Sequence, residues 1–233
     1  MDTSHLRYPT NICISGLTAS GKTTHAHLLA GEFGLTYVSG SQIQLNFLGV
    51  SPIQSKDFWI THDAKALWDP DQFRRIDSEL LAVEARTTGC IFDTSTMPWR
   101  HQRSAFCIWL ESTLSSRVTK SIVSHRGRNQ FEIIDYPAKI AEKDAATIDL
   151  YRQLYAIQIG SDLSCFDMII DISDLIDEPT LDASLSSIAI AHKFVRAAAA
   201  LCLTGNQKYK NDLLKAVDEH PGVMQRCNFL PQP

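Results

Sequence analysis

Apolar residues along this chain alternate between short continuous runs and longer stretches with helical spacing. The short runs are bounded by turn residues or polar positions, which is typical of strands buried on both faces of a sheet. In the longer stretches an apolar residue recurs every third or fourth position, which predicts a helix between successive strands. Strand and helix in alternation favour a mostly parallel sheet with right-handed crossovers. The five runs that predict strands are 12–15, 35–39, 90–92, 105–110 and 166–172.

The clearest helix start is Asp69-Pro70, where a capping residue precedes a first-turn proline and an apolar stripe runs on to Gly89. A preceding helical pattern, from 41 to 68, is broken by Gly49 and Pro52. The last predicted helix is followed by a tail rich in proline and glycine. The remaining helices are expected near 22–33, 114–122, 137–159, 180–205 and 206–219.

A glycine-rich stretch, Gly16 to Thr23, joins the first predicted strand to the first predicted helix. Glycine at both ends lets backbone N–H groups converge on a phosphate, and the helix adds its positive N-terminal end. Lys22 then reaches the terminal phosphates, and the Thr23 hydroxyl is placed to hold Mg²⁺. The alternative is a plain turn, but the flanking strand and helix favour a P-loop that binds ATP. Its candidate nucleotide-binding residues are Gly16, Ala19, Ser20, Gly21, Lys22, Thr23 and Thr24.

Composition narrows the class of protein further. The 233 residues have room for one sizeable α/β domain, and the net charge of −4 argues against a general nucleic-acid binder. The N-terminus has no signal-peptide pattern, and the run 197–203 is too short to span a bilayer, so we expect a cytoplasmic protein without a membrane partner. The six cysteines include no C-x-x-C pair, and those in predicted strands are expected to be small buried hydrophobes.

The chain lacks the D-x-x-G and N-K-x-D elements that switch GTPases need. It does carry cations about a hundred residues after the P-loop, as a kinase needs to neutralise a phosphoryl group in transfer. These cations predict a lid over about 124–150, and the alternative is a solvated basic face. They are Arg117, Lys120, Arg126, Arg128, Lys143 and Arg152.

With these motifs the sequence resembles the cytidylate kinases, especially the short archaeal type, within the nucleoside monophosphate kinase family. The resemblance spans roughly residues 10 to 175. It implies ATP with Mg²⁺ as phosphoryl donor, a mobile lid, and an acceptor held beyond the strand ends. The segments that carry it are 12–24, 33–39, 108–111 with Arg117, 154–157 and 166–171.

The chain also departs from this family. Where such kinases follow the second strand with an aspartate and then an arginine, this chain has only polar and apolar residues over 41–45. After the third strand it has Asp93 and a run of hydroxyl residues, with Arg100 only later. In the lid helix the family's Arg-Glu pair is replaced by Lys143-Asp144, and a following arginine by Leu150. Fewer planar cations make a dianionic phosphate acceptor harder to hold, which favours an uncharged acceptor.

The sequence therefore predicts a three-layer α/β P-loop kinase fold over 1–205, with an acceptor-binding segment at about 40–75 and a helical extension over 206–233. The predicted reaction moves the γ-phosphoryl group of ATP to a hydroxyl of a small, nucleoside-like metabolite. Asp93 is a candidate general base, a Mg²⁺ residue beside Thr23, or only a turn residue. Catalytic candidates are Lys22, Asp93, Lys143, Arg126 and Arg128, Arg117 is a further nucleotide contact, and acceptor contacts are Ser39, Ser41, Gln42, Asp93 and Arg100.

Two alternatives stay open at this point. One is a kinase for cytidylate or a related nucleoside monophosphate, and the other is a nucleotide-binding sensor or assembly protein without catalysis. The expected partners are ATP and a small-molecule acceptor, and a homodimer is possible. The extension, with Cys227 and Phe229, is expected to cap the core in preference to forming a dimer contact.

Overall fold

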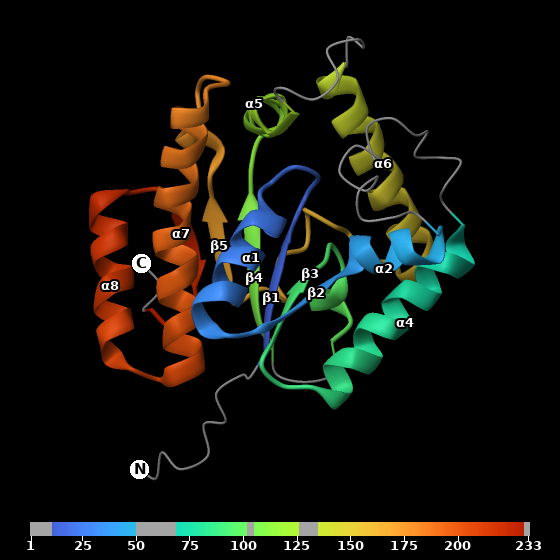
Figure 1. The fold of residues 1–233 in the computed structure, drawn as a ribbon, viewed down its shortest axis with the longest axis horizontal. Helices are drawn as coiled ribbons and strands as arrows, with labels where there is room; N and C mark the ends of the chain where they lie inside the picture. Colours follow the sequence, from blue (N-terminus) through green and yellow to red (C-terminus); the bar gives the residue numbers. More distant parts are fainter. Residues whose placement is uncertain (1–10, 50–68, 102–104, 126–134, 231–233) are drawn as a thin grey trace.

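In the computed structural model, residues 11–49, 69–101, 105–125 and 135–230 are described. They form a sheet of six strands in the order β2-β3-β1-β4-β5-β6, with the first five parallel (Figure 1). Strand β1 lies in the middle of the sheet, between β3 and β4. The loop after β1 therefore opens at the point where the order of the strands changes direction. The strands are β1 Asn11–Gly16, β2 Thr36–Ser39, β3 Cys90–Asp93, β4 Ala105–Glu111, β5 Met168–Asp171 and β6 Met224–Cys227.

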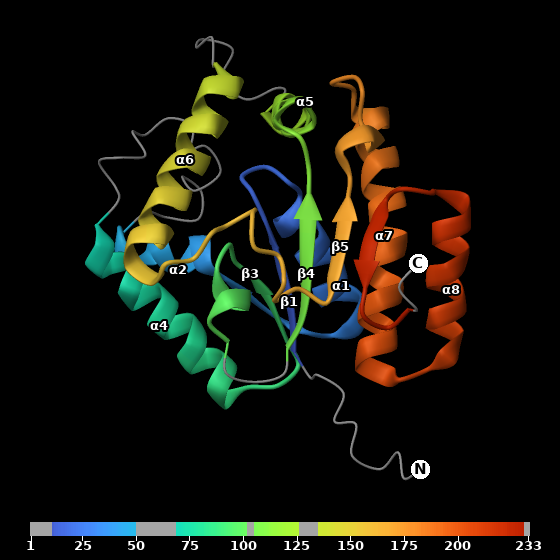
Figure 2. The same ribbon diagram turned by 180° about the vertical axis from the view of Figure 1, so that it is seen from behind.

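Helices cover both faces of the sheet and give the predicted three layers. Figures 1 and 2 show α7 and α8 on one flank and α4 and α6 on the other. Strand β1 serves both layers, because Ile12 and Ile14 pack in one core cluster and Cys13 in the other. The helices are α1 Lys22–Phe33, α2 Gly40–Phe47, α4 Pro70–Arg86, α5 Leu114–His125, α6 Tyr136–Tyr155, α7 Leu181–Thr204 and α8 Gln207–Glu219, with short 3₁₀ turns Met97–Trp99 and Ser173–Leu175.

Local sequence explains several of these boundaries. The Asp69 carboxylate caps α4 by accepting a hydrogen bond from the Asp71 N–H at 2.9 Å, and Pro70 occupies the first turn. Helix α7 begins after Thr180, whose hydroxyl caps it, and ends at Gly205 in the left-handed conformation. The cysteines expected in strands, Cys13, Cys90 and Cys107, are all buried.

The prediction of five strands was wrong by one. Strand β6 pairs antiparallel with β5, at the edge of the sheet, where a proline- and glycine-rich tail was expected. It has no apolar run to signal it, because its sequence is Met-Gln-Arg-Cys and only Cys227 is fully buried. Its neighbours hold it in place: the Arg226 guanidinium donates to the carbonyls of Leu163 and Phe166.

Helix α7 is long and apolar enough to cross a membrane by length and composition, and it is the helix that passes this test within the described residues. In the apolar window of this helix, 56% of the residues are buried inside the protein. Its side chains pack with β-strand and α1 residues in one core cluster. The burial fits the core helix of a globular domain.

Some predicted segments lie outside the described residues. The broken helical segment is seen only as α2, since 50–68 are not described. The same holds for Arg126 and Arg128, in the predicted lid. The lid region is therefore described by α5, before that gap, and by α6, after it.

Candidate active site

The glycine-rich loop has the backbone that its sequence predicts. Gly16 is required by a close approach, because a Cβ there would lie 2.6 Å from the Leu110 carbonyl oxygen. Gly21, with φ +100°, and Ala19, with φ +61°, both adopt the left-handed region. Helix α1 then begins at Lys22 without a side-chain cap, so its first N–H groups are left for a phosphate.

Asp93 lies beside this loop because β3 pairs with β1, with Ile14 opposite Asp93. One carboxylate oxygen, Oδ2, accepts two hydrogen bonds, from the Thr23 hydroxyl at 2.6 Å and the Tyr37 hydroxyl at 2.9 Å. Burial and the Asp93 charge raise the pKa of Tyr37 far above its usual value, so the phenol stays protonated as a donor. Asp93 and Thr23 are predicted from the sequence, whereas Tyr37 is not.

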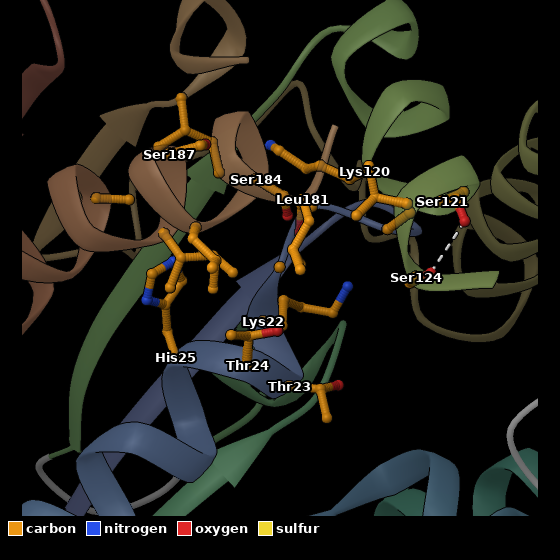
Figure 3. Close-up of a pocket in the computed structure, with 18 residues that line it drawn as sticks. Lys22, Thr23, Thr24, His25, Lys120, Ser121, Ser124, Leu181, Ser184 and Ser187 are labelled. Carbon is orange, nitrogen blue, oxygen red and sulfur yellow. Dashed lines mark hydrogen bonds between the residues drawn. The ribbon is translucent and has the colours of Figure 1, made fainter. Parts of the chain in front are cut away.

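A cavity of about 410 Å³ opens on one side of the loop, between α5 and α7, and we call it the α7-side cavity. Figure 3 shows Lys22, Thr24 and His25 on its floor, with Lys120 facing them from α5 and Leu181, Ser184 and Ser187 from α7. Its walls are mostly aliphatic and hydroxyl side chains. Cavities of this size take small molecules.

A second cavity, of about 380 Å³, opens on the other side of the loop, and we call it the α4-side cavity. Ala19, Lys22 and Thr23 line both cavities. The P-loop lysine and threonine therefore stand between two separate spaces. Other residues that line the α4-side cavity are Thr18, Gly40, Ser41, Gln44, Phe73, Ile76, Asp77, Leu80, Asp93, Thr94, Ser95, Lys143, Thr147 and Tyr151.

Three lysines line these cavities, Lys22 both of them, Lys120 the α7-side cavity and Lys143 the α4-side cavity, and each has a depressed pKa. Burial, with Lys22 nearby, lowers the pKa of Lys143 to about 8. Burial, with the Arg117 charge nearby, lowers the pKa of Lys120 to about 8. Burial also lowers the pKa of Lys22, whose ammonium group donates to the Leu17 carbonyl at 2.8 Å. Cations held out of water in this way interact strongly with incoming phosphate charge.

Arg117, predicted as a further nucleotide contact, makes its described contacts within the protein. It is 5% exposed, lines neither cavity, and donates to the Ser112 carbonyl and to the Thr18 carbonyl, each at 3.0 Å. Its guanidinium also forms an ion pair with Asp144, which in turn accepts from the Thr18 N–H at 3.0 Å. These contacts join α5, α6 and the P-loop. A contact of Arg117 with nucleotide stays a prediction.

Among the expected acceptor contacts, Ser41 and Asp93 line the α4-side cavity. The other three, Ser39, Gln42 and Arg100, do not. Ser39 caps α2 by accepting from the Gln42 N–H at 3.2 Å. The Gln42 side chain instead donates to Asn46 at 3.0 Å and lines neither cavity. The Arg100 guanidinium forms an ion pair with Asp77 at 3.1 Å and sits 3.8 Å above the ring of Tyr155, also outside the lining.

Asp77 and Gln44 both line the α4-side cavity, and neither is predicted as a site residue from the sequence. Asp77 accepts from the Tyr151 hydroxyl at 3.1 Å, and burial raises its pKa. A signal for Asp77 was present, because it is a carboxylate next to Ile76 on the buried stripe of α4. Gln44 has no such signal, since the helix pattern around it is short and broken.

No family model matches this chain. A cytidylate kinase from Pyrobaculum aerophilum is 31% identical over 166 residues, which cover 70% of this chain and 84% of the relative. A cytidylate kinase from Pyrobaculum islandicum is 31% identical over 179 residues, covering 76% of this chain and 91% of the relative. A cytidylate kinase from Sulfolobus acidocaldarius is 28% identical over 187 residues.

Solved structures with a similar fold include a shikimate kinase from Acinetobacter baumannii, at 15% identity and a TM-score of 0.39, over 66% of this chain and 84% of that one. A deoxyadenosine kinase from M. mycoides has 13% identity and a TM-score of 0.43, over 78% of this chain and 98% of that one. Both are too distant for any conclusion about the site. The parallel sheet, the loop after its central strand and the sequence relatives agree on a single class: the chain belongs to the cytidylate kinase family and is a phosphotransferase with the P-loop kinase fold.

Proposed function

We propose that this protein transfers the γ-phosphoryl group of ATP to a hydroxyl of a small, uncharged, nucleoside-like metabolite. The observation that carries the proposal is the pair of cavities that meet at Lys22 and Thr23. A cationic side chain and a hydroxyl side chain that line both cavities suit an enzyme that binds the phosphoryl donor in one cavity and the acceptor in the other.

The donor half follows from the P-loop. Its N–H groups and Lys22 hold the β- and γ-phosphates, and the α7-side cavity takes the nucleoside portion of ATP. The hydroxyl of Thr23 and the carboxylate of Asp93 are hard oxygen groups that lie together, as Mg²⁺ prefers. When bound, the ion neutralises phosphate charge and orients the γ-phosphoryl group.

The charge of the acceptor half supports an uncharged acceptor. Among the described residues that line the α4-side cavity there is no arginine, and the lysines Lys22 and Lys143 lie at its P-loop end together with Asp93. The undescribed stretch 50–68 contains no arginine in its sequence. In the segment 41–45, where the resemblance predicts an arginine that grips the acceptor, Leu45 is 3% exposed, and Leu150, in place of a lid arginine, is 7% exposed. A phosphate dianion needs paired cations, and away from the P-loop end the described lining residues of the α4-side cavity include none.

Asp93 supports attack by a hydroxyl. Its Oδ2 is taken by Thr23 and Tyr37, and within the described residues Oδ1 accepts no hydrogen bond. In the proposed step, the acceptor oxygen bonds to the γ-phosphorus, the bond from this phosphorus to the β–γ bridging oxygen breaks, and the hydroxyl proton passes to Asp93. Lys22 and Lys143 neutralise the charge that spreads over the moving group. ADP leaves with the former bridging oxygen.

The second candidate is transfer to cytidylate, which the names of the relatives favour. It would place the acceptor phosphate against Lys143 and Lys22, at the P-loop end of the α4-side cavity. Both candidates use the same donor half. They differ only in the acceptor.

The test is ADP release from ATP and Mg²⁺ with a panel of nucleosides, amino alcohols and nucleoside monophosphates. We expect turnover with a neutral hydroxyl compound, and loss of that turnover in the control variant Lys22→Ala, which guards against a contaminating kinase. Turnover with cytidylate alone would contradict the proposal. So would the absence of turnover with every acceptor in a protein that still binds ATP.

A further inference from the structure

The side chain of Gln44 differs from its neighbours on α2. Helix α2 begins directly after β2 and is capped by Ser39. It therefore starts at the carboxyl ends of the parallel strands, where the P-loop also lies. Gln44 is 6% exposed and lines the α4-side cavity. Within the described part of the chain its Nε2 group has no hydrogen-bond partner. A buried donor without a partner costs free energy unless something supplies an acceptor atom.

Much of this end of the cavity is apolar. Phe73, Ile76 and Leu80 form a wall on α4, and the Tyr151 ring meets the Phe73 ring edge-on at 5.9 Å. The Tyr151 hydroxyl donates to Asp77, whose other oxygen is paired with Arg100. Among the described side-chain atoms that line this cavity and are shielded from solvent, the Gln44 Nε2 group is the donor that has no hydrogen-bond partner.

Resting on the proposed function above, we propose that Gln44 selects the acceptor by donating its Nε2–H to a carbonyl oxygen or ring nitrogen of a nucleoside-class compound. The flat ring of that compound packs on the α4 wall, and its hydroxyl points to Asp93 and the P-loop. A plain polyol fits this cavity poorly, because its hydroxyls would lose water against Phe73 and its neighbours without a partner.

Such an arrangement makes Gln44 a specificity-determining residue. A site built to hydrogen-bond a substrate group discriminates strongly against a compound that lacks the group, since the buried protein donor is then left unpaired. Replacing the donor by an apolar side chain of similar size removes that discrimination. The phosphoryl donor is unaffected, because Gln44 lines only the α4-side cavity.

The test compares the variants Gln44→Leu and Gln44→Glu with the wild-type protein, using cytidine, uridine and the base-free compound ribose as probes. We expect KM for the preferred nucleoside to rise about tenfold or more in both variants, with kcat and the KM for ATP nearly unchanged. Ribose should be a poor acceptor in the wild type and indifferent to the substitutions. Asn46→Ala is the matched control, since Asn46 is exposed on the same helix.

Several results would overturn the inference. An unchanged nucleoside KM in Gln44→Leu would do so, as would ribose turnover equal to that of the nucleosides. A rise in the KM for ATP that matches the rise for the nucleoside would indicate a general structural defect and would also contradict it. Turnover of neutral hydroxyl compounds without any effect of Gln44 leaves the proposed function standing, whereas turnover of monophosphates alone removes both.

Discussion

Asp93 receives two hydrogen bonds on one carboxylate oxygen, from Thr23 on α1 and from Tyr37 on β2, the strand paired with β3. The side chain is thereby fixed in orientation beside Lys22 and Thr23. A fixed carboxylate next to a phosphate loop suits proton transfer, because a general base must be held within hydrogen-bond reach of the hydroxyl that it activates.

Replacing Asp93 by asparagine keeps the size of the side chain and removes its basicity. We expect Asp93→Asn to lower kcat by about 10²- to 10⁴-fold, measured as ADP release at saturating ATP with the most active acceptor. Tyr37→Phe removes one of the two orienting hydrogen bonds and should cost much less. An undiminished rate in Asp93→Asn would exclude it as the base.

The lysines of the site predict a pH dependence. Burial lowers the pKa of Lys143 and of Lys120 to about 8 each, so both lose their positive charge as the pH rises through that value. Because ATP binds to the charged forms, we expect kcat/KM for ATP to fall above about pH 8. Arginine stays charged in this range, so the double variant Lys120→Arg/Lys143→Arg should show a weaker decline, which then comes from Lys22, whose pKa burial also lowers. A profile in the wild type that stays flat to about pH 9 would contradict the assignment.

The sequence predicts those site residues that belong to a local motif. Lys22 and Thr23 belong to one continuous loop, and Asp93 ends an apolar strand, so pattern alone finds them. The roles of Asp77 and Gln44 in the site depend on Tyr151, Arg100 and the α4 wall, which lie far away in the sequence. A contact of this kind has no signature in a single sequence.

The elements around the P-loop are joined by the Arg117–Asp144 ion pair. Asp144 in α6 accepts from the Thr18 N–H, and Arg117 in α5 donates to the Thr18 carbonyl. The two side chains are 7% and 10% exposed, so neither charge is well solvated when its partner is removed. The pair thus sets the position of α5 and α6 against the loop that holds the phosphates.

A double-mutant cycle measures this coupling. We expect Arg117→Met alone to lower the free energy of unfolding in urea by about 3–5 kcal/mol, because it leaves Asp144 charged and buried. The double variant Arg117→Met/Asp144→Leu should lose clearly less than the sum of the two single variants. Additive losses would show that the two side chains do not act as a pair.

The sequence predicts helices and strands well where a pattern spans the whole element. Helix α4 follows its apolar stripe and its cap, and β4 follows its continuous apolar run. Arg117 shows the opposite case: its charge and position suggest an exposed lid cation, but Asp144, on the next helix, provides a buried partner. The ion pair with Asp144 determines the environment of Arg117 in the folded protein. The apolar pattern of a helix carries no information about such a pair.

At the scale of the whole molecule, the C-terminal residues pack with the main domain. Strand β6 extends the sheet beyond β5, and Leu213 and Ala216 of α8 lie in the same core cluster as α1 and α7. The antiparallel edge strand was not predictable from its residues, since its pairing depends on the finished sheet. The expectation that 206–233 caps the core in preference to forming a dimer contact stays a prediction.

Two adjacent leucines test this packing. Leu213 is fully buried and Leu214 is 42% exposed, so the same substitution should have very different effects. We expect Leu213→Ala to lower the free energy of unfolding by about 2–5 kcal/mol, and Leu214→Ala by less than about 1 kcal/mol. Urea denaturation monitored by tryptophan fluorescence measures both. Equal, small losses would indicate that α8 contributes little to the core.

We propose a neutral hydroxyl compound as the acceptor, although the chain belongs to the cytidylate kinase family. A competition assay distinguishes the two acceptors: the protein receives γ-labelled ATP with cytidine and cytidylate at equal concentration, and the labelled product is identified. We expect the label in a phosphate monoester, cytidine carrying one phosphate. Label found only in a phosphoanhydride, as in a nucleoside diphosphate made from cytidylate, would contradict the proposal.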